Sequence, residues 1–140
     1  MNEPDLARSL LRSAQTIAVV GYSARPDRPS NSVSAYLRRN GYRIVPVNPK
    51  LRGATIEGQP AYDRLVDIPP AERIDLIDVF RRGEFLDDVV DDALASGMTA
   101  IWFQLGLGNV EAAGRAESMG LRVVWDRCTA IEHRQLRVEG

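Results

Sequence analysis

The sequence predicts an α/β fold in which a five-stranded parallel sheet is covered by helices on both faces. Five short, β-prone apolar segments alternate along the chain with amphipathic segments that have helical spacing. Strands that are apolar along most of their length are typical of a parallel sheet buried on both faces, with right-handed crossovers between its strands. At 140 residues, without an internal repeat or a linker-like tract, the chain is expected to form a single domain over residues 1–140.

The first third of the chain contains the first four predicted elements. Apolar residues on one face predict a helix from Pro4 to Ala14, and the β-prone run Thr16–Val20 predicts the first strand. A helix over Ser32–Asn40 is expected to end at Gly41, because glycine is favoured just beyond a helix end. The second strand, Arg43–Val47, ends close to a proline, which has no N–H for a sheet ladder.

The rest of the chain begins with an irregular stretch and then returns to the alternating pattern. Between Leu51 and Ile68, glycines and a proline predict a loop with one short helix at Asp63–Val66. Asn109 is expected to cap the helix that follows it. The remaining predicted strands are Ile74–Phe80, Thr99–Phe103 and Leu121–Trp125, and the remaining helices are Glu84–Ser96, Val110–Met119 and Thr129–Leu136.

Composition excludes several classes of function. A formal net charge of −1 with mixed charges gives no bulk attraction to nucleic acid. One cysteine and one histidine exclude an internal disulfide and a cysteine-rich zinc cluster, so we predict no metal site and a reducing compartment. The N-terminus lacks the pattern of a signal peptide and no run is apolar enough to span a membrane, so we expect a cytoplasmic protein without membrane association.

The loop after the first strand is the strongest candidate for a ligand site. The strand ends at Gly21, and a polar loop leads to a helix that Ser30, Asn31 or Ser32 could cap. A strand, a glycine turn and a helix N-terminus together form a phosphate-binding arrangement, because unpaired N–H groups and the helix dipole point at the ligand. In parallel sheets, ligands also bind beyond the carboxyl ends of the strands where strand order reverses. We therefore predict a nucleotide site here.

The residues after the first two strands narrow the choice of nucleotide. The loop that begins Gly21-Tyr22-Ser23 lacks the G-x-G-x-x-G fingerprint of a dinucleotide site. After the second strand, where an NAD site needs a carboxylate, Asn48-Pro49-Lys50 offers a cation that suits a phosphorylated ribose. NADP and coenzyme A both carry such a phosphate, so this charge does not choose between them. Arg25 and Arg28 could bind a pyrophosphate, and the long loop favours coenzyme A slightly.

Five motifs in order resemble a known family. They are Val19-Val20-Gly21-x-Ser23-x-x-x-x-Arg28-x-Ser30, Pro46-Val47-Asn48-Pro49, Asp78-Val79-Phe80-Arg81, Trp102-Phe103-Gln104-x-Gly106 and Asp126-Arg127-Cys128-x-x-Ile131-Glu132. Together they resemble the small stand-alone CoA-binding proteins, which are similar to the N-terminal domain of the succinyl-CoA synthetase alpha subunit. The resemblance runs from about Ala14 to Leu136.

The resemblance implies a Rossmann-like, doubly wound fold, for which we predict the strand order 3-2-1-4-5. It implies coenzyme A or an acyl-CoA as the ligand, and no enzymatic activity is established for the stand-alone group. Lys50 would lie near the nucleotide phosphates, Val79 and Phe80 would flank the adenosine, and Gln104 would lie near the pantetheine. The full set predicted to bind the cofactor is Gly21, Tyr22, Ser23, Arg25, Arg28, Ser30, Asn31, Ser32, Asn48, Pro49, Lys50, Val79, Phe80 and Gln104.

No catalytic residue is predicted. The phosphorylated histidine of the synthetase belongs to a part that has no counterpart here, and nothing marks His133 as that residue. Two hypotheses stay open: a CoA-binding module without catalysis, and a small enzyme that uses NADP or an acyl-CoA in the same cleft. Cys128, beside Arg127 at a helix start, could form a mixed disulfide with the coenzyme A thiol, although free cysteines are most often buried. A homodimer or an unidentified protein partner also stays open.

Overall fold

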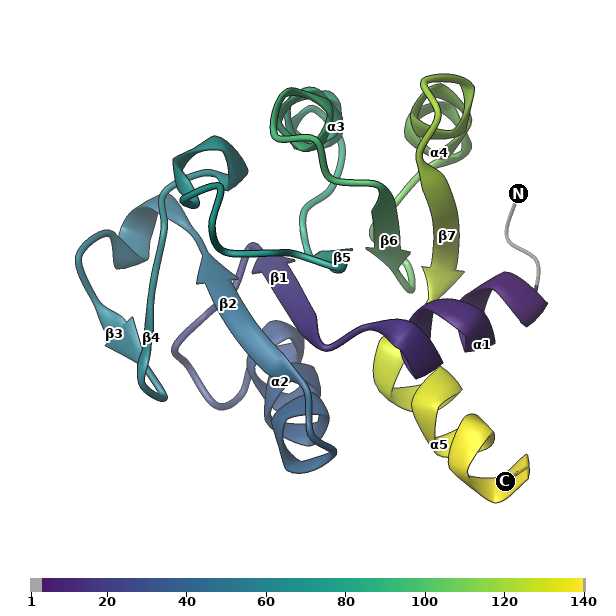
Figure 1. The fold of residues 1–140 in the computed structure, drawn as a ribbon, viewed down its shortest axis with the longest axis horizontal. Helices are drawn as coiled ribbons and strands as arrows, with labels where there is room; N and C mark the ends of the chain where they lie inside the picture. The colour runs from purple at the N-terminus through teal and green to yellow at the C-terminus, as the bar shows by residue number, and fades with distance from the viewer. Residues whose placement is uncertain (1–3, 140) are drawn as a thin grey trace.

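The computed structural model describes residues 4–139, and a five-stranded parallel sheet forms its centre (Figure 1). The sheet strands are β1 (Thr16–Val20), β2 (Arg43–Val47), β5 (Leu76–Val79), β6 (Ala100–Gln104) and β7 (Arg122–Arg127). Their order is β2-β1-β5-β6-β7. The predicted α/β class, the five parallel strands and the reversal of strand order beside β1 are confirmed.

The edge outside β2 differs in detail from the predicted order 3-2-1-4-5. That order places a full third strand outside β2, whereas the third sheet strand, β5, pairs with β1. Outside β2, residues 4–139 form no further strand of this sheet, and a parallel bridge joins Val47 to Tyr62. The segment after β2 is interrupted by glycines and a proline, and it forms η1 (Pro49–Leu51), the short hairpin β3 (Thr55–Ile56) and β4 (Gln59–Pro60), and η2 (Leu65–Asp67).

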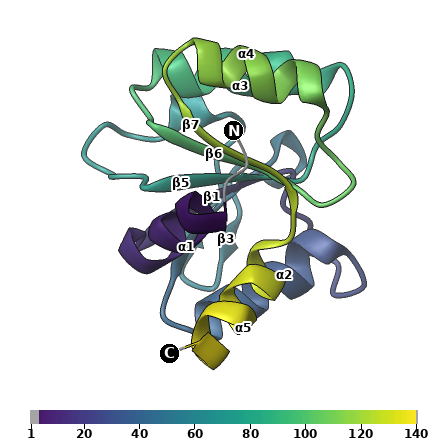
Figure 2. The same cartoon turned by 90° about the vertical axis from the view of Figure 1, so that its right-hand side faces the viewer.

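Helices cover both faces of the sheet, as expected (Figure 2). Helices α3 (Phe85–Ala95) and α4 (Val110–Ser118) lie on one face, and α1 (Pro4–Ser13), α2 (Pro29–Arg39) and α5 (Thr129–Glu139) lie on the other. Successive strand residues alternate between these two cores: Ala18 packs on the α3 side, whereas Ile17 and Val19 pack on the α2 side. Both faces are therefore closed, and the ends of the strands are left for ligands.

Helix α2 starts earlier than predicted, and its cap differs. Pro29 is the first helical residue, Arg28 occupies the cap position, and no side chain caps the helix. Proline suits the first helical position because its φ angle is already helical and it needs no N–H acceptor. The prediction that Ser30, Asn31 or Ser32 caps this helix is therefore wrong, since all three lie in its first turn.

Helix α5 is held against α1 and α2 by polar contacts. The Arg8 guanidinium pairs with Glu139 at 2.8 Å, and the Tyr36 hydroxyl lies 2.8 Å from Nδ1 of His133, which is buried. Burial, with a smaller effect of the Arg137 charge, lowers the pKa of His133 and so favours the neutral imidazole beside Tyr36. Among residues 4–139, no helix has the length and apolarity that a membrane span requires.

Candidate functional site

A cleft of about 550 Å³ lies at the carboxyl ends of β1, β2 and β5, where the strand order reverses. The loop between β1 and α2 forms one wall, and η1, the segment after β5 and the loop after β6 contribute the rest. Its lining residues are Gly21, Tyr22, Ser23, Ala24, Arg25, Arg28, Pro29, Ser30, Asn48, Lys50, Leu51, Phe80, Arg82 and Leu107. Most of the residues predicted to bind a cofactor are thus brought together at one place.

Gly21 permits a close approach of two backbones at the centre of the cleft. Its φ angle is +84°, and a Cβ atom there would lie 2.7 Å from the carbonyl oxygen of Phe80. Its own N–H donates to the carbonyl oxygen of Val47 at 2.9 Å. The role of Gly21 is therefore steric, because its N–H already has an acceptor in the protein.

Side chains in the first turn of α2 fix the loop that precedes it. The N–H of Ser23 donates to Oγ of Ser30 at 3.0 Å, and Nδ2 of Asn31 donates to the carbonyl oxygen of Ser23 at 2.9 Å. Oγ of Ser23 in turn accepts from the N–H of Arg25 at 3.2 Å. Asn31 and Ser32 do not line the cleft, so Asn31 acts on the shape of the loop and Ser32, which is exposed, is turned away.

The cleft is positively charged. Arg25, Arg28, Lys50 and Arg82 line it, and none of the described lining residues is Asp or Glu. Arg25 pairs at 3.0 Å with Asp27, but both side chains are about two-thirds exposed, so water screens this pair (65% and 64%). The N-terminus of α2 adds its dipole to the same loop. This arrangement suits a ligand with several phosphate groups.

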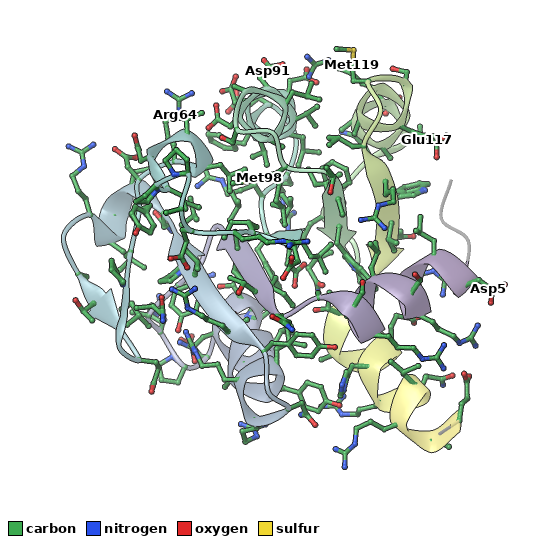
Figure 3. The ribbon with its side chains drawn as sticks, in the orientation of Figure 1. Asp5, Arg64, Asp91, Met98, Glu117 and Met119 are labelled. Atoms are coloured by element: carbon green, nitrogen blue, oxygen red, sulfur yellow. The ribbon has the colours of Figure 1, made fainter. Side chains whose placement is uncertain are left out.

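A smaller, more apolar hollow of about 240 Å³ lies on the α3 side of Gly21. Arg64, beside η2 in Figure 3, forms a two-point ion pair with Asp92 of α3 at 2.6 and 3.1 Å. The Arg81 guanidinium lies 4.0 Å from the centre of the Phe85 ring, which is also part of this hollow. Its lining residues are Val20, Gly21, Val47, Pro49, Asp63, Arg64, Leu65, Arg81, Phe85, Asp88, Val89 and Asp92.

Of the residues in this second hollow, Gly21 and Pro49 belong to the predicted cofactor-binding set. The main cleft is also lined by residues outside that set: Ala24, Pro29, Leu51, Arg82 and Leu107. Arg81 and Arg82 follow a predicted strand end, a signal that could have identified them. The contact between η2 and α3 joins segments far apart in the chain, and no local pattern indicates it.

Another hollow, of about 510 Å³, lies at the opposite edge of the sheet, and its chemistry is different. It is lined by Ser13 at the end of α1 and by residues 96–99, which follow the end of α3. Helix C-termini carry partial negative charge, which disfavours a phosphate. The carboxylates of Glu72 and Asp75 also line this hollow and offset the charges of Arg73 and Arg122. The cleft at the carboxyl edge is therefore the better candidate for an anionic ligand.

Two predicted ligand residues, Val79 and Gln104, are buried and line neither the cleft nor the smaller hollow. Val79 is fully buried in the core on the α3 side, and Gln104 is 4% exposed. Gln104 does not line the cleft, and its Oε1 accepts from the N–H of Thr129 at 3.0 Å. Gln104 therefore shapes the end of β6 from inside.

A buried carboxyl lies beside this glutamine. Asp78 has no exposed surface, and its Oδ2 is 2.9 Å from the hydroxyl of Thr129. Burial raises the pKa of Asp78 to about 8, although the bond to Thr129 acts in the opposite direction. Cys128, the residue before Thr129, is half-buried against the core on the α2 side. Among residues 4–139, no group of three or more metal-ligating side chains has a geometry that could hold a metal ion.

Comparison with known proteins identifies a family and a similar protein of nearly the same length. A family model described as "CoA binding domain" matches residues 15–134. The Bacillus subtilis protein YneT, itself named as uncharacterized, is 38% identical over 135 residues, which cover 95% of this chain and 97% of YneT.

Solved structures show the same fold. A Thermus thermophilus protein named cell-free ID.343 is 37% identical, with a TM-score of 0.87 over 96% of this chain and 98% of its own. A dinucleotide-forming acetyl-coenzyme A synthetase from Ca. Korarchaeum cryptofilum is 25% identical, with a TM-score of 0.68. That match covers 86% of this chain and only 27% of the synthetase, so the likeness is to one part of a larger enzyme.

Proposed function

We propose that this chain, which belongs to the CoA-binding domain family, binds coenzyme A or an acyl-CoA at the carboxyl edge of its sheet. The ligand would be held through its phosphates and its adenosine. The protein would bind it without catalysis of its own. The observation that carries this proposal is a cleft with four cations and no carboxylate among its described lining residues, at the reversal of strand order.

The charges of the cleft match the charges of coenzyme A. Its pyrophosphate needs several charge-assisted hydrogen bonds, and the N–H groups of Gly21 and Ser23 are already occupied within the protein. The guanidinium groups of Arg25 and Arg28 would therefore bind the pyrophosphate, because each offers a fork of donors. Lys50, which is exposed on η1, would pair with the 3′-phosphate of the ribose.

The smaller hollow would hold the adenine. Phe85 and Val89 give it an apolar wall, and the carboxylates of Asp63 and Asp88 could accept from the exocyclic amino group. Gly21 lines both hollows, so the base and the phosphates could lie on its two sides. Phe80 would contact the ligand from the main cleft, whereas Val79 would support that wall from within the core.

Native mass spectrometry tests this proposal. The protein is mixed with equimolar coenzyme A, acetyl-CoA, NADP and NAD, and we expect complexes with the first two ligands only. Release of free coenzyme A from acetyl-CoA over time would contradict a role without catalysis and favour an acyl-CoA enzyme. A complex with NADP alone would overturn the choice of ligand and lead to redox assays.

A further inference from the structure

Three side-chain oxygen atoms, from Asp78, Thr129 and Gln104, lie close together where β5, β6 and α5 meet. The Thr129 hydroxyl lies 2.9 Å from Oδ2 of Asp78 and 3.1 Å from Oε1 of Gln104. The backbone N–H of Thr129 donates to the same Oε1 at 3.0 Å. All three side chains are buried. This group, Asp78, Thr129 and Gln104, is called the buried triad below.

The orientation of Gln104 is fixed by the backbone. An N–H donor must face an oxygen, so the Gln104 atom beside Thr129 is Oε1, and Nε2 points away from Thr129. The Thr129 hydroxyl has a single proton for two neighbouring oxygens. If Asp78 were ionised, one of the two contacts would join a pair of oxygens with no proton between them, which is repulsive.

A proton on Asp78 completes the network. Its O–H then donates to Oγ1 of Thr129, and the Thr129 hydroxyl donates to Oε1 of Gln104. Every short contact in the buried triad has one proton in this arrangement, and Gln104 Oε1 receives two hydrogen bonds. Only the protonated form satisfies the geometry fully.

The surroundings of Asp78 also disfavour a charge. Its neighbours across the sheet are Val19 on β1 and Trp102 on β6, and its Oδ1 is buried without a hydrogen-bond partner among the described residues. On β7 and α5, Nη1 of Arg127 pairs with Glu132 at 3.1 Å, whereas its Nε is buried without a hydrogen-bond partner, and His133 contacts Tyr36. No ion pair within residues 4–139 reaches Asp78, so an ionised carboxyl would remain uncompensated.

We propose that Asp78 is a neutral carboxylic acid in the folded protein and a positioning residue, whose proton fixes Thr129 and Gln104 and so joins the ends of β5 and β6 to the start of α5. Ionisation of Asp78 removes one of the two hydrogen bonds to Gln104 and loosens this edge of the sheet. The protonation itself is independent of the proposed function. Its effect on coenzyme A affinity rests on that function, because the ligand would bind at the same edge.

Carbon-13 NMR of protein labelled at the aspartate carboxyls measures the protonation directly and requires no ligand. We expect one carboxyl resonance to titrate near pH 8 and to be missing from Asp78→Asn. Asp75 is an internal reference: burial acts to raise its pKa, but N–H groups from Gln15 and Thr16 and the Arg73 charge lower it overall. If every aspartate titrates below about pH 5 in the folded protein, the proposal is wrong.

Two variants separate positioning from bulk stability. Asp78→Asn keeps a donor toward Thr129 without a titratable proton, so its affinity for coenzyme A should not change between about pH 7 and pH 9. Over the same range the wild-type affinity should fall several-fold. Thr129→Val, which removes the hydroxyl between Asp78 and Gln104 but keeps the backbone hydrogen bond to Gln104, should lose affinity at every pH. Equal pH dependence in wild type and Asp78→Asn would overturn the positioning role, whereas absence of coenzyme A binding at every pH would refute the proposed function and leave the NMR result standing.

Discussion

The side-chain amide of Asn48 donates from Nδ2 to the carbonyl oxygen of Tyr22 at 2.9 Å, and so joins the loops after β2 and β1. Its Oδ1 accepts from the N–H of Lys50 at 3.0 Å, which starts the turn that presents the lysine. Asn48 was predicted to bind the cofactor, and it lines the cleft. Its amide atoms hold the two loops in register, which suggests a supporting role for the ligand contacts around it.

Asn48→Ala should therefore weaken both stability and ligand binding. Loss of the two hydrogen bonds should lower the free energy of unfolding by about 1–2 kcal/mol, measured by urea denaturation. The affinity for coenzyme A should fall as well, because Lys50 loses its position. Asn40→Ala is the matched control, since Nδ2 of Asn40 donates to the Tyr36 carbonyl at 2.8 Å away from the cleft. If the two variants lose affinity equally, Asn48 has no particular role in the site.

Gly21→Ala should disrupt the cleft. The new Cβ would lie 2.7 Å from the Phe80 carbonyl oxygen, and the residue would keep a φ of +84°, which is unfavourable for alanine. We expect a loss of about 2–4 kcal/mol in the free energy of unfolding, from backbone strain together with the steric clash. Gly41→Ala has a similar φ of +95° but no atom within 4 Å of its Cβ. Its cost should be clearly smaller, and an equal cost would show that the contact with Phe80 is easily relieved.

Phe85→Ala tests the apolar hollow as the adenine site. Phe85 is 43% exposed, so its truncation should cost little stability and should weaken coenzyme A and dephospho-coenzyme A by a similar factor. Met119→Ala, at the end of α4, is the control, because Met119 is 55% exposed and lies outside this hollow (Figure 3). An unchanged affinity in Phe85→Ala, measured by calorimetry, would remove this ring from the binding site.

The free energy of unfolding should depend on pH through Asp78. Between its ordinary pKa of 3.8 and the folded value of about 8, the folded state holds a proton that the unfolded state has lost. The contribution of Asp78 to stability is then complete below about pH 4 and falls as pH rises, by about 1.4 kcal/mol per pH unit within the window. Asp78→Asn should lack this slope.

The difference between wild type and Asp78→Asn separates the effect of Asp78 on the free energy of unfolding from the effects of other titrating groups. His133, whose pKa is lowered by burial and by Arg137, acts at acid pH and contributes equally to both proteins. Denaturant unfolding at a series of pH values gives the difference directly. Parallel curves for wild type and Asp78→Asn would contradict a neutral Asp78.

The sequence identified most of the fold because its signals are local. Apolar strands, glycines beyond helix ends and the Asn109 cap, whose Oδ1 accepts from Ala112 N–H at 2.8 Å, each depend on neighbouring residues. Strand order was harder to predict, since the placement of β5 beside β1 depends on long-range pairing such as the N–H of Phe80 to the Val20 carbonyl at 2.8 Å. Nothing local distinguishes that pairing from a third strand outside β2.

The site residues were likewise predictable only where their position follows from a strand end nearby in the sequence. Gly21, Lys50 and the loop arginines follow strand ends, and their positions in a parallel sheet bring them together. Gln104 also follows this rule, but its side chain turns inward to Thr129, a residue 25 positions later. The pairing of Arg64 with Asp92 across 28 positions likewise follows only from tertiary packing.

The most direct test of the account is calorimetric titration with coenzyme A, dephospho-coenzyme A, NADP and NAD. Wild-type protein should bind coenzyme A best, and loss of the 3′-phosphate should weaken binding by about tenfold or more, the effect of one charge-assisted contact. Lys50→Ala should lose a similar factor with coenzyme A and little with dephospho-coenzyme A. The Arg25→Ala, Arg28→Ala double variant should weaken both. Arg8→Ala is the control, because Arg8 pairs with Glu139 and lines neither the cleft nor the smaller hollow. Preferential binding of NADP or NAD, or no binding of any of the four, would contradict the central claim.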